Sequence, residues 1–184
     1  MSDPVIRIRR AIHDDAPAIG EAHGSAWEAA YGHVFEQPFL KGAADSRRLG
    51  WLNAIDPLLI APNFVLVAEL DGLVLAYAHG APAGDGTPVG EIHGFYSNPA
   101  AWGSGAATLL MTEACSILAT TWREVVLWTM QEAHRARSFY EKVGFRLTGA
   151  EKREPLSNWL TGEIVEQTAV QYGKPLSLPR FGVV

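Results

Sequence analysis

"NPAAWGSGAATLLM", residues Asn98 to Met111, is the stretch that decides the fold. Gly103 and Gly105 flank a serine there, and a helix of small and apolar residues is predicted to follow at once. Glycine allows left-handed backbone dihedrals and lets a bulky anion approach the main chain. The first amides of a helix lack partners inside it, and the helix dipole adds about half a positive charge there. The stretch therefore predicts a turn whose main-chain amides bind phosphate.

Two common phosphate-binding loops differ from this turn. A Walker loop needs a lysine after its last glycine, and the sequence has no lysine between Lys41 and Lys142. A dinucleotide-binding loop has a third glycine where Thr108 stands, and it needs an acidic residue at the end of the next strand. In the apolar stretch EVVLWTM that acid, Glu124, comes at the start instead. The comparison excludes a Walker-type enzyme and leaves a nicotinamide-dependent enzyme as a minor alternative.

Hydrophobic periodicity on both sides of the turn predicts short strands. VIRIRRA alternates apolar and charged residues, which indicates a half-buried first strand. Asp71 and Gly72 separate two apolar runs, and this pair is a strong signal for a hairpin turn. EVVLWTM is a continuous β-branched and aromatic run, as in a buried strand. The predicted strands are 5–11, the two hairpin arms within 63–82, 89–99, 124–130, 145–150 and 164–174.

Capping residues and prolines predict where the helices begin and end. The first helix begins at Asp14 or Asp15. A second, short helix begins at Asp45 or Ser46 and stops at Pro57, because proline cannot continue a helix. The predicted helices are 14–32, 44–57, 106–119 and 132–143.

This order of strands and helices indicates an α+β fold with one mixed sheet in a single domain, 1–184. The chain has 184 residues, of which 48% are hydrophobic and 19% charged, so it can bury a sizeable core. The net charge of −5 argues against a protein that binds nucleic acid.

The N-terminus lacks the apolar segment of a signal peptide, and no apolar run approaches the roughly 18 to 20 residues that cross a bilayer. The single cysteine, Cys115, lies in an apolar helical stripe and is predicted to be a buried small hydrophobe. We therefore expect a cytoplasmic protein with no membrane contact and no disulfide.

Two motifs together resemble one known family. The turn from Trp102 onward is similar to the Q/R-x-x-G-x-G/A loop of the GCN5-related N-acetyltransferases (GNAT), although tryptophan replaces the usual glutamine or arginine. RARSFYEKVGF, from Arg135 to Phe145, resembles the A-x-x-F-Y-E-K-x-G-F signature that follows the fifth strand in that superfamily. The likeness extends over nearly the whole chain, as far as a closing AVQYGKPL.

The resemblance implies a GNAT-like α+β fold. Its central sheet would be mostly antiparallel, with about seven strands and four helices, and would splay between the fourth and fifth strands. The core would span 5–173, followed by a tail over 175–184.

The resemblance also implies acetyl-CoA (coenzyme A) as the cofactor. The pantetheine arm would bind to the backbone of one strand end, and the pyrophosphate to the loop. The implied cofactor-binding residues are Phe95, Tyr96, Ser97, Trp102, Gly103, Ser104, Gly105, Ala106, Ala107 and Thr108.

For catalysis, the resemblance aligns Tyr140 with the tyrosine that protonates the departing thiolate. A phenol has a normal pKa near 10 and stays protonated at neutral pH, so it suits this role. An amine acceptor must also lose a proton. Glu91 and His93 are the candidate bases, since both lie on one strand face, and water alone is a further alternative. The family's asparagine before this motif falls on Ala133, and His134 beside it could replace the lost contact.

The acceptor side of the cleft is expected to include Trp27 and Tyr31. Aromatic rings together with the nearby Glu28 and Glu36 would suit a cationic amine. Simple helix packing by the aromatic stripe is an equal alternative for Trp27 and Tyr31.

The leading hypothesis is an acetyl-CoA-dependent N-acetyltransferase that acts on a primary amine of a small molecule or peptide by direct attack on the thioester. The alternative is a non-catalytic acyl-CoA-binding or sensing domain. No metal site is expected. A homodimer through the edge of the last strand or through the tail is left open.

Overall fold

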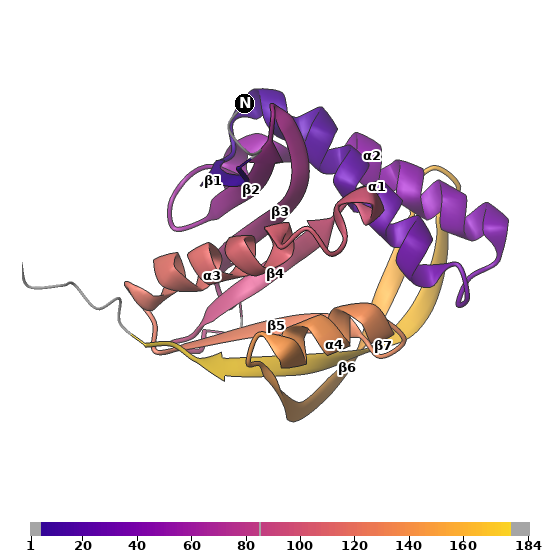
Figure 1. The fold of residues 1–184 in the computed structure, drawn as a ribbon. Coiled ribbons are helices and arrows are strands. Elements are labelled where there is room, and N and C mark those ends of the chain that lie inside the picture. The colour runs from indigo at the N-terminus through magenta and orange to yellow at the C-terminus, as the bar shows by residue number, and fades with distance from the viewer. Residues whose placement is uncertain (1–4, 85, 178–184) are drawn as a thin grey trace, which may run out of the picture.

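The computed structural model describes residues 5–84 and 86–177. Seven strands form one open sheet in the order β1-β2-β3-β4-β5-β7-β6, and every neighbouring pair is antiparallel except β4 and β5. Figure 1 shows helices on both sides of this sheet. The elements are β1 (Arg7–Arg10), α1 (Ala16–Tyr31), α2 (Gln37–Leu58), β2 (Phe64–Leu70), β3 (Leu73–Pro82), β4 (Gly90–Ser97), α3 (Ala106–Ala119), β5 (Glu124–Met130), α4 (His134–Lys142), β6 (Arg146–Asn158) and β7 (Glu163–Pro175). This architecture confirms the predicted fold class.

The side chains of β2 alternate between two hydrophobic layers. Phe64 and Leu66 pack in the cluster that contains the apolar face of α3, whereas Val65 and Val67 pack with residues of α1 and α2. Successive strand residues point to opposite faces of a sheet, so a continuous apolar run buries both faces. The sheet therefore lies between α3 on one face and the α1–α2 pair on the other.

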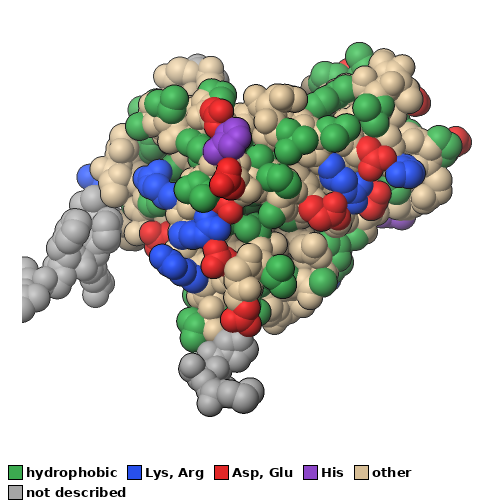
Figure 2. All heavy atoms as spheres, turned by 90° about the horizontal axis from the view of Figure 1, so that it is seen from above, with side chains coloured by type: hydrophobic (Ala, Val, Ile, Leu, Met, Phe, Trp, Pro, Cys, Tyr) green, Lys and Arg blue, Asp and Glu red, His purple; other side chains and the backbone are tan. Residues whose placement is uncertain are grey.

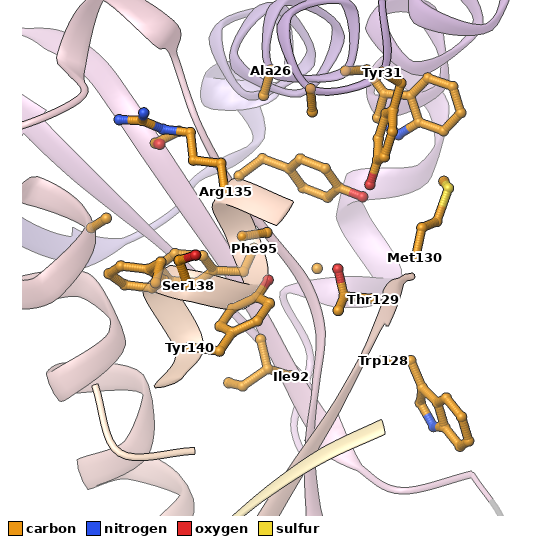
Figure 3. Close-up of a pocket in the computed structure, with 18 of the residues that line it drawn as sticks. Ala26, Tyr31, Ile92, Phe95, Trp128, Thr129, Met130, Arg135, Ser138 and Tyr140 are labelled. Carbon is orange, nitrogen blue, oxygen red and sulfur yellow. The ribbon is translucent and has the colours of Figure 1, made fainter. Parts of the chain in front are cut away.

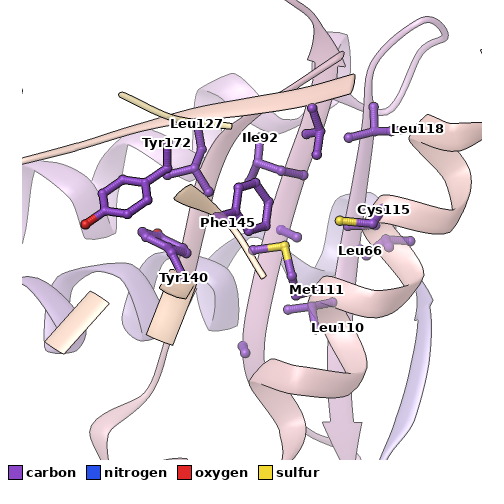
Figure 4. Close-up of a cluster of buried hydrophobic side chains, with 14 of the residues drawn as sticks. Leu66, Ile92, Leu110, Met111, Cys115, Leu118, Leu127, Tyr140, Phe145 and Tyr172 are labelled. Carbon is purple, nitrogen blue, oxygen red and sulfur yellow. The ribbon is translucent and has the colours of Figure 1, made fainter. Parts of the chain in front are cut away.

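The α3 side of the core contains Cys115, as Figure 4 shows among Leu110, Met111 and Leu118. Burial raises the pKa of the Cys115 thiol above its usual value. The prediction of a buried small hydrophobe is confirmed.

The turn between β2 and β3 confirms the predicted hairpin. Asp71 has a φ of 50° and Gly72 a φ of 82°, and two residues with positive φ match the twist of the strands that they connect.

The prediction for the second helix was wrong. Helix α2 begins at Gln37, after Glu36 in an extended conformation, and it includes Pro57 in its last turn. Its early part is stabilised by burial of Phe39, Leu40 and the alanines that follow, a stripe that the expected start at Asp45 or Ser46 omits. Ser46 lies inside the helix, where its Oγ donates to the Gly42 carbonyl oxygen at 2.8 Å.

The last two strands also differ from the prediction. Strand β6 continues to Asn158, well past the expected end at residue 150, because it pairs with β7 along most of its length. Strand β7 lies between β5 and β6, so the last strand has no free edge. The edge strands of the described sheet are β1 and β6, which corrects the surface expected for a homodimer. Most of the predicted tail, 178–184, lies outside the described residues.

Among the helices of the described residues, none has the length and hydropathy required of a membrane-spanning segment.

Candidate active site

The sheet opens between β4 and β5. These parallel strands pair only over Gly90–Ile92 and Val125–Leu127, although β4 continues to Ser97 and β5 to Met130. A cavity of about 760 Å³ occupies the space where they diverge. Figure 3 shows labelled side chains from α1, β4, β5 and α4 around it. The predicted residues that line the cavity are Trp27, Tyr31, Glu91, His93, Phe95, Tyr96, Ser97, Trp102, Gly103, Gly105, Ala107, Thr108 and Tyr140.

The glycine loop has the backbone that the sequence predicts. Gly103 has a φ of 86°, and Gly105, at the N-cap of α3, has a φ of 89°. A Cβ atom added at either glycine would meet nothing within 4 Å, so the main chain is open to a ligand. Within the described residues, the amides of Gly103, Gly105, Ala107 and Thr108 donate to no protein group. These four amides can therefore bind an anion at the N-terminus of the helix.

Two predicted cofactor-binding residues lie outside the cavity lining. The side chain of Ala106 is buried in the α3 core, and its amide donates to Ser104 Oγ at 3.3 Å. The Ser104 hydroxyl group thus accepts a hydrogen bond at the start of the helix, and Ser104 does not line the cavity.

Trp102, which replaces the usual glutamine or arginine, connects the loop to its surroundings. Its Nε1 donates to the Ser97 carbonyl oxygen at 3.2 Å. The Arg135 guanidinium carbon lies 3.9 Å from the centre of the Trp102 ring, and Arg135 also lines the cavity. The indole therefore positions a cation beside the open amides, and the sequence reasoning did not identify Arg135.

Tyr140 is buried, and its hydroxyl group is directed into the cavity (Figure 3). Its ring packs edge-on against Phe95, Phe139 and Phe145. Burial, together with the nearby Tyr96, raises the pKa of Tyr140 well above its ordinary value. No hydrogen bond within the described residues involves its hydroxyl group. Tyr140 thus holds a proton that it can donate to a group in the cavity.

Glu91 and His93 form a pair at the point where the strands separate. His79 pairs with Gly94 and Gly80 with Ile92, so His93 is the extra residue of a β-bulge. Its Nδ1 lies 3.3 Å from Glu91 Oε1, and the side chains are 31% and 15% exposed.

The Pro82 carbonyl oxygen shows which nitrogen of His93 carries a proton. It lies 3.1 Å from His93 Nε2, and a carbonyl only accepts, so Nε2 carries a proton. In the neutral imidazole Nδ1 then presents its lone pair to the Glu91 carboxylate, and one added proton between them satisfies both. The pair can therefore accept one proton from a group in the cavity.

His79 lies behind the pair, with its ring centre 5.2 Å from that of His93. Burial, with a smaller contribution from His93, lowers the pKa of His79 to about 4. His79 is therefore neutral at physiological pH.

Comparison with known proteins identifies the family. The profile of the acetyltransferase (GNAT) family matches residues 25–145, well over half of the chain. The chain belongs to the GNAT acetyltransferase family.

Solved structures of low sequence identity share this GNAT fold. The PaiA N-acetyltransferase from Thermoplasma acidophilum, solved in complex with coenzyme A, has a TM-score of 0.73 at 16% identity, covering 93% of this chain and 99% of its own. The ribosomal-protein-S18-alanine N-acetyltransferase from Escherichia coli has a TM-score of 0.65 at 15% identity, covering 98% and 99%. No curated protein matches the chain at a significant level.

Trp27 and Tyr31 lie at the α1 end of the GNAT cavity. Both are buried in an aromatic cluster with Phe35 and Phe39, and both also line the cavity. The two interpretations weighed from the sequence are therefore compatible, because one edge of each ring can pack while another faces the open space.

The carboxylates expected for a cationic acceptor lie elsewhere. Glu28 pairs with Arg48 at 3.0 Å, and Glu36 lines a separate, smaller pocket. Neither lines the main cavity. Figure 2 shows acidic and basic side chains interleaved over α1 and α2, in keeping with this pairing. The suggestion of a cationic amine held by Glu28 and Glu36 was wrong.

The charged side chain at this end of the cavity is Arg47, which the sequence analysis did not identify. Arg47 on α2 lines the cavity beside Trp27 and Tyr31. The sequence did contain a pattern that indicates this position. Arg47 follows Ala43 by four residues and precedes Trp51 by four, so it places a cation in an apolar helical stripe.

His33, Glu132 and His134 form a cluster whose ligand atoms lie within 4.8 Å of one another. None of them lines the cavity, so the cluster contributes no group to the site.

Ala133, at the family's asparagine position, is buried against the α1–α2 cluster. The side chain of His134 is 67% exposed, its Nε2 lies 3.4 Å from Glu132 Oε2, and it does not line the cavity.

Proposed function

We propose that this GNAT protein transfers an acetyl group from acetyl-CoA to a primary amine of a small molecule or peptide. The observation that carries the proposal is the parting of β4 and β5 around a cavity. The glycine loop lies on one wall, and the Tyr140 hydroxyl group and the Glu91–His93 pair face the interior.

The residues at the loop suit coenzyme A. Four open amides precede or begin α3, and the left-handed glycines leave their approach unobstructed. Arg135 and Lys142 also line the cavity, so cationic side chains accompany the amides. This donor set matches a pyrophosphate group, which carries negative charge and accepts hydrogen bonds. The coenzyme A complex of the Thermoplasma acidophilum enzyme, which shares the fold, supports the same assignment.

The chemistry divides between two protonic groups of the chain. Acetyl-CoA, when bound, supplies a thioester whose carbonyl carbon can react with an amine. The Glu91–His93 pair accepts the proton that an ammonium group must lose before it can attack. Tyr140 donates its hydroxyl proton to the thiolate that leaves, and the second proton that the nitrogen loses as the amide forms restores the Tyr140 hydroxyl group. No covalent bond to the protein is required.

The test is release of free thiol from acetyl-CoA in the presence of a panel of primary amines. We expect amine-dependent thiol release by the wild type and a loss of about 10²- to 10⁴-fold in kcat for Tyr140→Phe, because the general acid is removed. The matched control is Tyr172→Phe, whose hydroxyl group contacts Arg137 and Glu141 rather than the cavity. That control should retain activity.

Two outcomes would count against the proposal. A wild-type protein that binds acetyl-CoA and releases no thiol with any amine would support the alternative of an acyl-CoA-binding domain without turnover. Full activity in Tyr140→Phe would remove the tyrosine from the mechanism.

A further inference from the structure

Arg47 is a cation at the acceptor end of the cavity without a carboxylate partner. Its guanidinium carbon lies 3.5 Å from the centre of the Trp27 ring, and Nη1 donates to the Ala43 carbonyl oxygen at 2.8 Å. No ion pair within the described residues involves Arg47. Burial lowers the pKa of Arg47, which reflects the loss of hydration around its charge. A guanidinium group has five N–H donors, so most of them remain available.

Arg48, the next residue of α2, is an arginine whose charge is balanced within the protein. Arg48 pairs with Glu21, Glu28 and Asp45, each at 3.0 Å. Three carboxylates thus converge on Arg48, on the face away from the cavity, while Arg47 receives none. A partly desolvated charge is costly unless it is paired, and stacking on an indole offsets only about 0.5 to 2 kcal/mol.

Apart from Lys142, the last residue of α4, the other charged side chains of the cavity lining have partners. Glu91 pairs with His93, and Lys152 pairs with Glu154 at 2.9 Å. Arg135 stacks on Trp102 in the loop. The side chains that interact with Arg47 are aromatic, and they include Trp27, Tyr31 and Tyr96. The acceptor end therefore presents one positive charge in an apolar setting.

We propose that the acceptor is a small amine that carries a carboxylate group, and that Arg47 binds this carboxylate. The inference rests on the proposed acetyl transfer. A planar guanidinium group matches a carboxylate through two parallel hydrogen bonds. One negative charge balances Arg47, whereas a phosphate would leave excess charge among the aromatic rings. The carboxylate would lie at α2, and the amine would point toward the Glu91–His93 pair.

The experiment compares amines that differ only in this charge. Glycine, β-alanine, 4-aminobutanoate and phenylalanine are each assayed against their carboxamides, with acetyl-CoA, in the wild type and in Arg47→Gln. The measured quantity is the ratio of kcat/KM for the acid to kcat/KM for its amide. Dividing the wild-type ratio by the variant ratio cancels differences in amine basicity. We expect the quotient to be about 10- to 100-fold for at least one pair, the size of a charge-assisted hydrogen bond.

Controls separate charge recognition from folding. Arg48→Gln removes the neighbouring cation, which lies outside the cavity, and should leave the ratio unchanged. Arg47→Lys retains the charge without the planar fork and should give an intermediate ratio. The affinity for acetyl-CoA, measured by calorimetry, should be the same in all variants that fold.

Three outcomes overturn the inference. The first is a wild type that acetylates the amides or diamines as well as the acids. The second is an acid preference that persists in both Arg47→Gln and Arg47→Lys, which would leave Arg47 as a structural support for Trp27. The third, absence of acetylation with every amine, overturns the proposed function and this inference with it.

Discussion

At the scale of single residues, Gly105 has a backbone conformation that favours glycine. Its φ of 89° and ψ of −11° lie in the left-handed region, two residues before the first of the open amides of Ala107 and Thr108. A non-glycine residue there costs roughly 1 to 2 kcal/mol of backbone strain. The side chain would also project into the space that the proposed pyrophosphate group requires, because nothing in the protein occupies it.

We expect Gly105→Glu to abolish acetyl-CoA binding in isothermal calorimetry, because the carboxylate adds bulk and negative charge at an anion site. The matched control is Gly72→Glu in the β2–β3 hairpin, where φ is 82° and space is equally open. Both variants carry similar backbone strain. A difference between their acetyl-CoA affinities therefore comes from the loop and not from the strain. Unchanged acetyl-CoA affinity in folded Gly105→Glu would defeat the assignment of the loop.

The element scale depends on how closely two helices approach. Gly20 and Gly24 of α1 face Arg48 of α2, and a Cβ at Gly20 would collide with the Arg48 carbonyl oxygen. Helical glycine normally costs about 1 kcal/mol relative to alanine. Here the missing side chain lets the main chains meet, so that α2 can place Arg47 at the cavity while Arg48 reaches Glu21 and Glu28.

At Gly20, a glycine-to-alanine substitution should destabilise the protein, although in most helices it is stabilising. We expect Gly20→Ala to lower the free energy of unfolding in urea by about 1 to 3 kcal/mol, as overpacked cores do, instead of raising it. Gly84→Ala, at an exposed position with nothing within 4 Å, is the control and should change stability by less than about 1 kcal/mol. A stabilised Gly20→Ala protein would show that the helices can separate without cost.

At the scale of the whole molecule, a partly buried histidine, His23, joins α1, α2 and the sheet. Trp51 Nε1 donates to His23 Nδ1 at 3.1 Å, the Tyr77 hydroxyl group lies at the same distance, and the Tyr96 ring centre is 4.1 Å away. Burial, with a smaller contribution from the Arg47 charge, lowers the pKa of His23 to about 3. The network therefore requires a neutral imidazole.

This histidine makes stability depend on pH. Below about pH 6.5 the unfolded chain binds a proton at His23 that the native protein does not, so its contribution is complete above that pH and declines toward pH 3. We expect the free energy of unfolding to fall by about 2 kcal/mol between pH 7 and pH 5 from this group. His79, whose pKa is also lowered, acts in the same direction.

Urea denaturation at pH 7, 6 and 5 measures the effect. We expect the acid sensitivity to be weaker in His23→Gln. His13→Gln is the opposing control, because the Asp56 carboxylate raises the pKa of His13. That group stabilises the native state at low pH and loses its effect as pH rises, so its removal cannot reduce acid sensitivity. Equal stability of the wild type at pH 5 and pH 7 would contradict a neutral His23 in the native protein.

Short-range features of the fold and site were predictable. The φ values of Gly103, Gly105 and Gly72 follow from glycine being the residue that adopts them without strain. Alternation and apolar runs located β2, β3 and β5, since a strand exposes its pattern within a few residues.

Features that depend on distant partners were not predictable. The full length of β6 depends on pairing with β7, and the early start of α2 depends on burial against α1 and β6. Arg47 and Arg48 are adjacent and chemically identical, yet only Arg48 receives Glu21 and Glu28, which lie 27 and 20 residues away.

The amino-acid sequence alone determined the kind of protein, because the glycine loop and the FYEKVGF signature are local arrangements that need no knowledge of the rest of the chain. The tertiary structure decided which charges are left for a ligand. Whether a cation is neutralised depends on which segments fold against it, and that is a property of the assembled sheet and helices rather than of any single stretch.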